Sequence, residues 1–226
     1  MDALIFDFDG VIVDSELIHL DCFARVLRPL GVTLAREDYF AKYLGFDDRD
    51  CFVAVLRDNG REASEEEVAR MVEAKTLLVQ ESYARDVKAL PGVMELLRSA
   101  AAAGVPLAIC TGGLPDEIEL ARRAIGAEGL FAAVVTARDV RHGKPHPEGY
   151  RLALKRLRAA TGRKLRAAAC VVVEDSPAGI DAARAAGLKV LAVTNSYPPE
   201  ALSRAHRVVA SLAQVRLDDL ENSAKP

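Results

Sequence analysis

Short apolar runs recur along the chain and alternate with longer stretches that have the periodicity of helices. The runs lie at residues 3–8, 105–110, 132–136, 169–173 and 189–193. Brief runs rich in valine and isoleucine, separated by helix-length segments, are typical of buried parallel strands in βαβ units. The pattern therefore predicts an α/β core with a parallel sheet, and residues 208–210 would add an edge strand.

Helix start and stop signals fill the gaps between these runs. The clearest begins at Ser176-Pro177, a capping residue followed by proline at the first helical position, and it closes at Gly187. We expect further helices over residues 91–104, 116–125 and 148–158. Each helix would connect two strands of the core.

The interval between the first and second apolar runs is too long for one crossover helix. Its apolar faces at residues 17–27, 39–43, 51–56 and 68–83 have helical spacing, with breaks at Pro29, Gly31, Gly45 and Gly60. We therefore expect an all-helical insertion over residues 15–86, hinged near residues 14–16 and 87–91, in a core made of residues 1–14 and 87–226. The tail, residues 221–226, is expected to fray.

Composition and charge narrow the class of protein. Half of the residues are hydrophobic and 28% are charged, which is typical of a soluble globular protein. The net charge of -3 leaves no basic excess for a nucleic acid or an anionic membrane surface, so neither partner is expected. Acidic residues interrupt the apolar N-terminus, no apolar run reaches a membrane span, and four scattered cysteines favour a reducing compartment. A cytoplasmic location is the expectation. The sequence leaves the oligomeric state open, with a monomer favoured over an oligomer.

Candidate chemistry begins at the end of the first run, where the chain reads Phe6-Asp7-Phe8-Asp9-Gly10. The period of two along a strand places Asp7 and Asp9 on the same side, and Gly10 allows a sharp turn. In open α/β sheets, ligands bind outside the carboxyl ends of the strands. Two carboxylates are therefore expected to converge there.

Later strand ends add a hydroxyl, a cation and more acids. These residues are Thr111 with Gly112 and Gly113, then Lys144, then Glu174 and Asp175. A hydroxyl and glycine amides can bind phosphate, a lysine can balance charge, and carboxylate oxygens suit Mg²⁺. Taken singly, Thr111 is better explained as a turn residue, Lys144 as a solvated surface charge and Asp175 as a cap of the following helix. Their joint placement at successive strand ends favours phosphoryl chemistry.

Four segments carry a resemblance to a known family. Residues 7–15, 109–113, 143–147 and 173–180 resemble the motifs of the haloacid dehalogenase-like hydrolase superfamily, in the subgroup with a helical cap inserted after the first motif. This subgroup includes phosphoglycolate phosphatase-like and β-phosphoglucomutase-like enzymes. The resemblance spans nearly the whole chain and implies a Rossmann-like three-layer parallel sheet core with an inserted all-helical cap domain.

The resemblance also implies a mechanism. Asp7 would attack phosphorus and form an aspartyl-phosphate, while Asp9 would protonate the leaving oxygen and later activate water. Thr111 would bind the transferring phosphoryl group, and Lys144 would pair with Asp7 and the phosphate.

A metal ion is the remaining part that the resemblance implies. Mg²⁺ would be held by Asp7, the backbone carbonyl of Asp9 and Asp175, with Glu174 beside or just behind it. A cation is needed because an anionic nucleophile must approach an anionic phosphate. The dehalogenases that give the superfamily its name do not require a cation, and they lack the second aspartate of the first motif. Asp9 therefore argues against dehalogenation.

Substrate-binding candidates in the cap follow from the same resemblance. Ser15 and His19 lie four residues apart, hence on one helix face, and β-phosphoglucomutase-like proteins have an active-site histidine at the second place. Arg49 ends a loop that resembles the substrate-selecting loop, shifted by one place, and Lys75 lies where relatives carry a substrate-binding lysine. Gly112 and Gly113 complete the set. The alternatives are a hydrogen-bonded core or hinge histidine for His19 and a solvated surface lysine for Lys75.

The function that these expectations describe is a Mg²⁺-dependent phosphatase of a small phosphorylated metabolite, in particular a sugar phosphate. One alternative is a β-phosphoglucomutase-like sugar-phosphate mutase. Gly113 and Pro115 argue against it, because neither offers a polar side chain to hold a second phosphate. A remote alternative from another class is a receiver-type phosphoacceptor signalling domain, which resembles a bare core without a cap.

Overall fold

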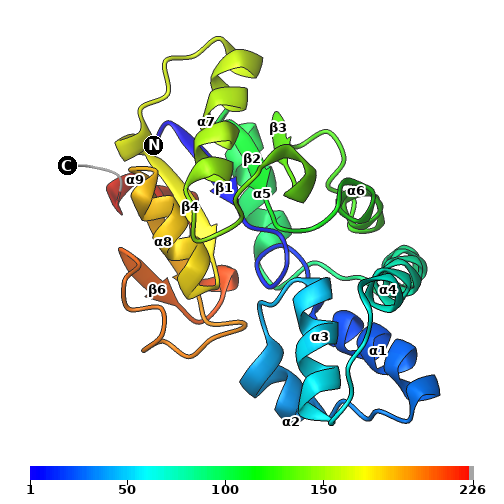
Figure 1. Cartoon of the computed structure of the whole chain (residues 1–226). Helices are drawn as coiled ribbons and strands as arrows, with labels where there is room; N and C mark the ends of the chain where they lie inside the picture. Colours follow the sequence, from blue (N-terminus) through cyan, green and yellow to red (C-terminus); the bar gives the residue numbers. More distant parts are fainter. Residues whose placement is uncertain (224–226) are drawn as a thin grey trace. The chain divides into compact units, whose positions relative to one another are not determined.

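The chain folds into two compact units (Figure 1). The computed structural model describes residues 1–223, with side chains as far as Leu220. The core unit comprises residues 1–14 and the chain from residue 88 onward, and the cap unit comprises residues 15–87. The cap unit therefore ends at residue 87, whereas the insertion was expected to end at residue 86.

A six-stranded parallel sheet forms the core unit. Its strands are β1 (Ala3–Phe6), β2 (Leu107–Cys110), β3 (Ala133–Val135), β4 (Cys170–Glu174), β5 (Lys189–Val193) and β6 (Arg207–Val209). They lie in the order β3-β2-β1-β4-β5-β6, with Ile5 opposite Ala108 on one side and Val172 on the other. The connections reverse direction between β1 and β4, the point at which sheets of this kind bind ligands. The predicted α/β class and edge strand are confirmed.

Helices cover both faces of this sheet and make three layers (Figure 1). Alternate residues of the strands, such as Ile5, Ala108 and Val172, form one apolar cluster with α7 (Glu148–Thr161) and α8 (Pro177–Ala185). On the other face, α5 (Val93–Ala102) lies against β2 and beside α9 (Leu217–Ser223). Helix α6 (Pro115–Ala124) follows β2. The predicted Rossmann-like layering is confirmed.

The predicted helix signals act as expected at α8. The Ser176 hydroxyl accepts a hydrogen bond from the amide of Gly179 at 3.1 Å, and Pro177 opens the helix. Helix α9 was not predicted, and it includes residues 221–223 of the tail that was expected to fray. Residues 224–226 of that tail lie outside the described residues.

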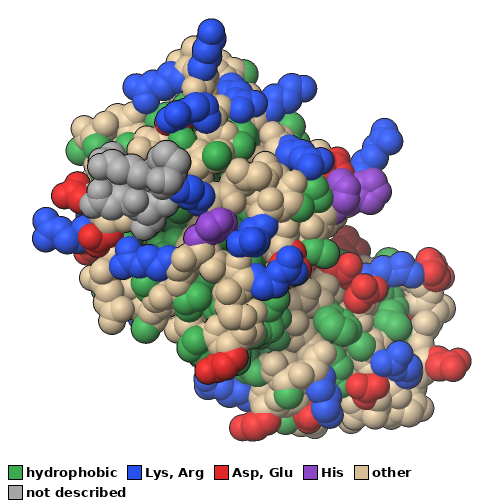
Figure 2. Space-filling model, turned by 90° about the vertical axis from the view of Figure 1, so that its left-hand side faces the viewer, with side chains coloured by type: hydrophobic (Ala, Val, Ile, Leu, Met, Phe, Trp, Pro, Cys, Tyr) green, Lys and Arg blue, Asp and Glu red, His purple; other side chains and the backbone are tan. Residues whose placement is uncertain are grey.

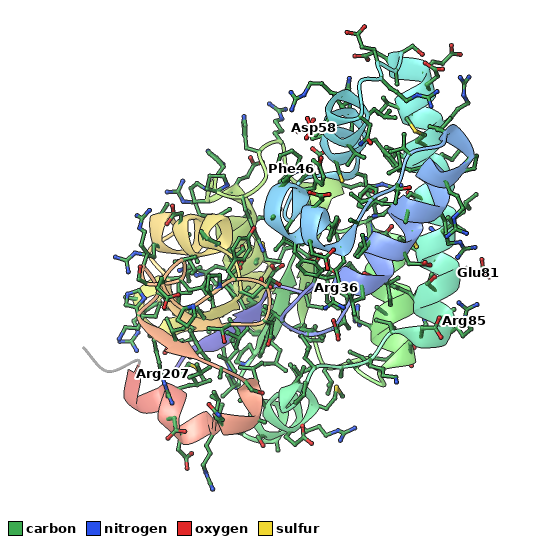
Figure 3. All side chains as sticks on the ribbon, turned by 90° about the horizontal axis from the view of Figure 1, so that it is seen from below. Arg36, Phe46, Asp58, Glu81, Arg85 and Arg207 are labelled. Carbon is green, nitrogen blue, oxygen red and sulfur yellow. The ribbon has the colours of Figure 1, made fainter. Side chains whose placement is uncertain are left out.

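The cap unit is helical throughout its described residues. It contains α1 (Glu16–Leu27), α2 (Arg36–Asp38), α3 (Asp48–Asp58) and α4 (Glu65–Asp86), with a π-helical turn over Tyr39–Tyr43. Phe23, Phe52 and Val55 lie in its own apolar cluster, and α4 packs against both α1 and α3. On the outer side of α4, Glu81 and Arg85 form an exposed ion pair of 3.6 Å (Figure 3). The predicted all-helical cap is confirmed.

Short 3₁₀ turns complete the chain at Arg28–Leu30, Ala137–Asp139, Ala167–Ala169 and Leu212–Gln214. The predicted breaks at Gly31, Gly45 and Gly60 have positive φ angles of 71°, 83° and 70°, as expected where helices end at glycine. Across the described part of the chain, no helix is both long and apolar enough to cross a membrane.

Candidate active site

Asp7 stands directly after β1, at the reversal point of the sheet. Its amide donates a hydrogen bond to the carbonyl of Val173 in β4 at 2.9 Å. The chain then turns back tightly, with Gly10 at a φ of 70°. A Cβ atom on Gly10 would stand 2.0 Å from Oδ2 of Asp175. Only glycine therefore permits this turn, which brings the loop after β1 against the acid after β4.

Lys144 reaches this point from the loop before α7. Its Nζ lies 2.8 Å from Oδ1 of Asp7 and 2.6 Å from Oε1 of Glu174, and 5.4 Å from the ring centre of Tyr150. The side chain is 19% exposed. The interpretation of Lys144 as a solvated surface charge is therefore wrong, because its ammonium group bridges two buried carboxylates.

Glu174, fully buried at the end of β4, accepts hydrogen bonds on both oxygens. Oε1 accepts from Lys144 and from the Tyr150 hydroxyl at 2.7 Å. Oε2 accepts from the amide of Asp175 and from the amide and hydroxyl of Ser176. A Cβ atom on Gly179 would lie 1.7 Å from Oε1, so the first turn of α8 needs glycine to admit this carboxylate. Glu174 thus fixes Lys144 and the turn between β4 and α8.

Asp175 is held by the loop after β5. The Ser196 hydroxyl donates to Oδ2 of Asp175, and the Asn195 side-chain amide donates to the carbonyl of Gly10 at 2.7 Å. These two residues, like Tyr150, were missed from the sequence. Asn195 and Ser196 follow the fifth strand, so the strand-end reasoning that found the other residues would have found them too. Tyr150 lies within a helix and gave no comparable signal.

Thr111 lies after β2 and is 5% exposed. Its amide donates to the carbonyl of Val135 at 3.0 Å, and its Oγ1 accepts from the amide of Gly113 at 2.9 Å. A Cβ atom on Gly113 would lie 3.4 Å from Oγ1 of Thr111 and 3.6 Å from Oδ2 of Asp9, whereas one on Gly112 would meet nothing within 4 Å. The structure thus brings Thr111, Gly113 and Asp9 to the same edge of the sheet.

Burial and charge set the protonation of these groups. Burial raises the pKa of Asp7 to about 7, with Lys144 opposing the rise and Glu174 adding to it. Burial and the neighbouring carboxylates of Glu174 and Asp7 likewise raise the pKa of Asp175. Burial alone would lower the pKa of Lys144, but Asp7 and Glu174 outweigh it and raise the pKa, so the ammonium form persists. Burial would raise the pKa of Glu174, but Lys144 and the hydrogen bonds lower it.

The acidic cluster fits a divalent cation. Asp7, Glu174 and Asp175 each offer a carboxylate oxygen, and the three atoms lie within 4.8 Å of one another. Three buried carboxylates face one ammonium group, so a cation would relieve their repulsion. The donors are hard oxygens, as Mg²⁺ prefers. Because both oxygens of Glu174 already accept hydrogen bonds, Asp7 and Asp175 are the better direct ligands.

Within the cap unit, Lys75 belongs to a second buried cluster. Lys75 is 1% exposed. Its Nζ donates a hydrogen bond to Oδ1 of Asp48 at 2.7 Å and lies 2.7 Å from Nδ1 of His19. The other ring nitrogen of His19 lies 3.0 Å from the Tyr83 hydroxyl. The interpretation of Lys75 as a solvated surface lysine is therefore wrong. His19 is hydrogen-bonded, as expected if it is a core or hinge histidine. Asp48 and Tyr83 were missed from the sequence.

The other two cap candidates are Ser15 and Arg49. Ser15 is buried at the start of α1, where its carbonyl accepts the amide of His19 at 2.9 Å. Arg49 is half exposed on α3 and pairs with Glu65 at 2.6 Å. Of the cap candidates, His19 and Lys75 contact each other, with 2.7 Å between Nδ1 and Nζ.

Comparison with known proteins decides the family. The family model described as haloacid dehalogenase-like hydrolase matches residues 4–193. The chain belongs to this family. The match confirms the resemblance read from the four segments and the predicted enzyme class, a phosphoric monoester hydrolase of this family.

Similar proteins extend over nearly the full chain. The validoxylamine A 7'-phosphate phosphatase of Streptomyces hygroscopicus subsp. limoneus is 33% identical over 224 residues, covering 94% of each chain. The phosphorylated carbohydrates phosphatase of Thermotoga maritima is 30% identical over 189 residues, covering 84% of this chain and 83% of its own. The crystal structure of CbbY from Rhodobacter sphaeroides, in complex with phosphate, superposes with a TM-score of 0.86 at 27% identity, covering 98% and 99% of the two chains.

Proposed function

We propose that this hydrolase removes phosphate from a small phosphorylated metabolite of the sugar phosphate class, through an aspartyl-phosphate on Asp7 and with Mg²⁺. One observation carries the proposal, namely the bond of Lys144 to Asp7 within the oxygen cluster that includes Asp175. A nucleophile, its counter-cation and metal donors are thereby combined. The relatives named for validoxylamine 7'-phosphate and for phosphorylated carbohydrates support the substrate class.

The reacting groups divide the work as follows. The Asp7 carboxylate attacks phosphorus, and the bond from phosphorus to the leaving oxygen breaks while Asp9 gives that oxygen a proton. Asp9 then takes a proton from the water that attacks the aspartyl-phosphate. Thr111 orients the phosphoryl oxygens, and Lys144 balances the charge between Asp7 and the phosphate.

Mg²⁺ would be held by Asp7, the main-chain carbonyl of Asp9 and Asp175, with Glu174 supporting from behind. The ion supplies Lewis-acid stabilisation of the phosphoryl charge. Ser196, which donates to Asp175, would orient that ligand. In the cap unit, we assign substrate selection to Ser15, His19, Arg49 and Lys75, with Lys75 as the principal cation. A cytoplasmic location stays a prediction.

Net hydrolysis is favoured over the mutase alternative by the loop after Thr111. A mutase must keep hold of a second phosphate while a bisphosphate intermediate turns around. Gly113, beside Asp9 and Thr111, has no side chain, and Pro115 opens α6 with no amide hydrogen to donate. Each missing charge-assisted hydrogen bond would weaken the binding of that phosphate by about 1.5 to 3 kcal/mol. Water would then take the aspartyl-phosphate.

Phosphate release from a panel of phosphorylated metabolites tests the proposal. We expect turnover of one or more sugar or polyol phosphates and of p-nitrophenyl phosphate. A receiver-type domain would turn over none of them catalytically. Incubation with β-glucose 1-phosphate and a catalytic amount of the 1,6-bisphosphate distinguishes a phosphatase from a mutase. Free phosphate indicates a phosphatase, whereas rapid formation of glucose 6-phosphate with little free phosphate would establish the mutase instead.

A further inference from the structure

A second cluster of metal-ligating side chains lies on the surface of the core unit, outside the acidic cluster. His142, His146 and Glu148 each offer a nitrogen or oxygen atom, and the three atoms lie within 4.8 Å of one another. The two imidazole rings stand 4.7 Å apart between their centres. The side chains of His142 and His146 are 65% and 50% exposed, so a hydrated ion can reach them. Figure 2 likewise shows histidine side chains at the molecular surface.

The carboxylate of this cluster is already held in place. Glu148, at the start of α7, accepts hydrogen bonds from the amides of Arg141 and His142 at 3.1 and 3.2 Å. Nδ1 of His142 lies 3.0 Å from Oε2 of the same carboxylate. Nδ1 of His146 lies 3.3 Å from the amide nitrogen of Glu148, a long hydrogen bond that a metal ion on this nitrogen would replace. An unprotonated imidazole nitrogen is the form that binds a metal.

The distances suit a tetrahedral ion. Two ligands bound to Zn²⁺ at about 2.0 to 2.1 Å and at a tetrahedral angle stand about 3.4 Å apart. Here Oε2 of Glu148 lies 3.0 Å from Nδ1 of His142 and 3.8 Å from Nδ1 of His146. Each of these two distances differs from that spacing by about 0.4 Å, and the ligand atoms of the two histidines lie within 4.8 Å of each other. The ion would replace any proton between His142 and Glu148, which would pass to solvent.

We infer that His142, His146 and Glu148 form a binding site for a divalent transition metal ion of the Zn²⁺ class. Two imidazoles and one carboxylate are a donor set that suits Zn²⁺, Ni²⁺ or Cu²⁺, whereas Mg²⁺ prefers oxygen donors. The site is therefore chemically distinct from the cluster of Asp7 and Asp175. Its ligands flank Lys144 in sequence, so the ion connects the two ends of the segment that carries this lysine.

Equilibrium dialysis of the full chain against Zn²⁺ tests this inference. The chain carries no added histidine tag, and a large excess of Mg²⁺ occupies the acidic cluster. We expect one Zn²⁺ per chain. His146→Ala and Glu148→Gln should each weaken binding by more than about tenfold, because each removes a ligand. Arg141→Ala, an exposed change in the same loop, should bind Zn²⁺ no more weakly than the unchanged chain. Glu148→Gln keeps a side-chain oxygen that can accept hydrogen bonds from the loop amides. Weaker binding by this variant therefore reflects loss of the ligand and not loss of the loop structure.

Two further measurements locate the ion. Amide hydrogen exchange should slow over residues 141–148 when Zn²⁺ is added. Asp175→Asn, which alters the acidic cluster, should leave this Zn²⁺ binding unchanged. The inference is overturned if no Zn²⁺ binds in excess Mg²⁺, if His146→Ala binds as tightly as the unchanged chain, or if Asp175→Asn abolishes binding. None of these readouts depends on phosphatase activity.

Discussion

Two lysines, one in each unit of the molecule, bond buried or half-buried carboxylates. In the core unit, Lys144 contacts Asp7 and Glu174, and Asp175 lies in the same group of carboxylates. In the cap unit, Lys75 contacts one carboxylate, Asp48, which is 27% exposed. When its carboxylates are ionised, the core cluster thus has more negative than positive charge, whereas the cap pair is balanced.

This difference in charge shows what each cluster can do. An excess of buried negative charge is costly unless a further cation joins it. The core cluster is therefore suited to a metal ion, which would balance its ionised carboxylates. The cap pair needs no further ion, since His19 and Asp48 already bond the ammonium group of Lys75. Altering the two clusters separately should expose this contrast.

The largest effect is expected from Asp7→Asn. The amide cannot act as the nucleophile and is a poorer metal ligand, so we expect phosphate release to fall by about 10⁴-fold or more. The side chains are of similar size, so the fold should remain. The measurement is turnover of p-nitrophenyl phosphate together with a circular dichroism spectrum.

The control for this change is Asp86→Asn at the end of α4, where the carboxylate is exposed and pairs with Arg85. It removes the same charge without touching either lysine cluster and should keep turnover. Near-normal phosphate release by Asp7→Asn would show that Asp7 is not the nucleophile. The core cluster would then not be the catalytic one of the two.

Of the two lysine clusters, metal removal is expected to affect that of Lys144 and not that of Lys75. Chelation with EDTA should abolish phosphate release, and added Mg²⁺ should restore it, because the oxygen donors of Asp7 and Asp175 suit this ion. Sodium chloride at matched ionic strength should restore nothing. Full turnover in the presence of the chelator would contradict the assignment of a metal to this cluster.

Exchanging each lysine for methionine compares the clusters directly. Lys144→Met should lower kcat by about 10²-fold or more and, without metal, destabilise the fold by about 3 to 5 kcal/mol, because it leaves buried carboxylates unpaired. Mg²⁺ should recover much of that stability by replacing the lost cation. Lys75→Met should show no such recovery, since the cap pair holds a single carboxylate.

Thermal unfolding of both variants with and without Mg²⁺ measures the difference. Equal recovery of Tm by Mg²⁺ in the two variants would mean that the excess charge of the core cluster is not what binds the ion.

The proposed role of Lys75 in substrate selection predicts that its replacement affects two substrates differently. Lys75→Ala should lower kcat/KM for the natural substrate by about ten to a hundredfold, and much less for p-nitrophenyl phosphate, which lacks the polar remainder of a metabolite. Arg85→Ala, at an exposed position in the last turn of the same helix (Figure 3), is the matched control and should change neither value. Equal losses on both substrates would make Lys75 a structural residue.

The contrast between the clusters also explains what the sequence could predict. Asp7, Thr111, Lys144 and Asp175 were found because each follows a strand, and parallel strands bring their carboxyl ends to one edge of the sheet. The strands and most helices were predicted from periodicity. The short helix α9 was missed, since Leu217–Ser223 offers too few residues for a periodic pattern.

Burial within the cap was not predictable in the same way. Lys75 is buried because α4 packs against both α1 and α3, and the partner of its charge, Asp48, lies on α3. The pattern of one helix cannot show which neighbour covers a lysine. Tyr150 was hidden for the same reason, because its bond to Glu174 joins a helix to the end of a strand.

The smallest expected effect concerns pH and sharpens the contrast further. The pKa of Asp7 is raised by burial to about 7, above its ordinary value. The protonated form of Asp7 therefore favours the metal-free fold at low pH, and this contribution to stability is lost as the pH rises through about 7. Mg²⁺ binding has the opposite sign, because the ion needs the ionised carboxylate and competes with its proton.

We therefore expect proton loss from Asp7 to raise the affinity of the core cluster for Mg²⁺ by up to about tenfold per pH unit below 7, and this contribution to level off above 7. Asp175, whose pKa is also raised, adds its own contribution. Isothermal titration calorimetry between pH 5.5 and 8, spanning that pKa of about 7, measures the trend. Asp7→Asn should flatten the part of the slope that Asp7 contributes, whereas Lys75→Ala should leave the slope unchanged because its cluster binds no ion. A Mg²⁺ affinity independent of pH in the unchanged chain would mean that Asp7 is already ionised in the metal-free protein, with Lys144 alone sufficient to neutralise it.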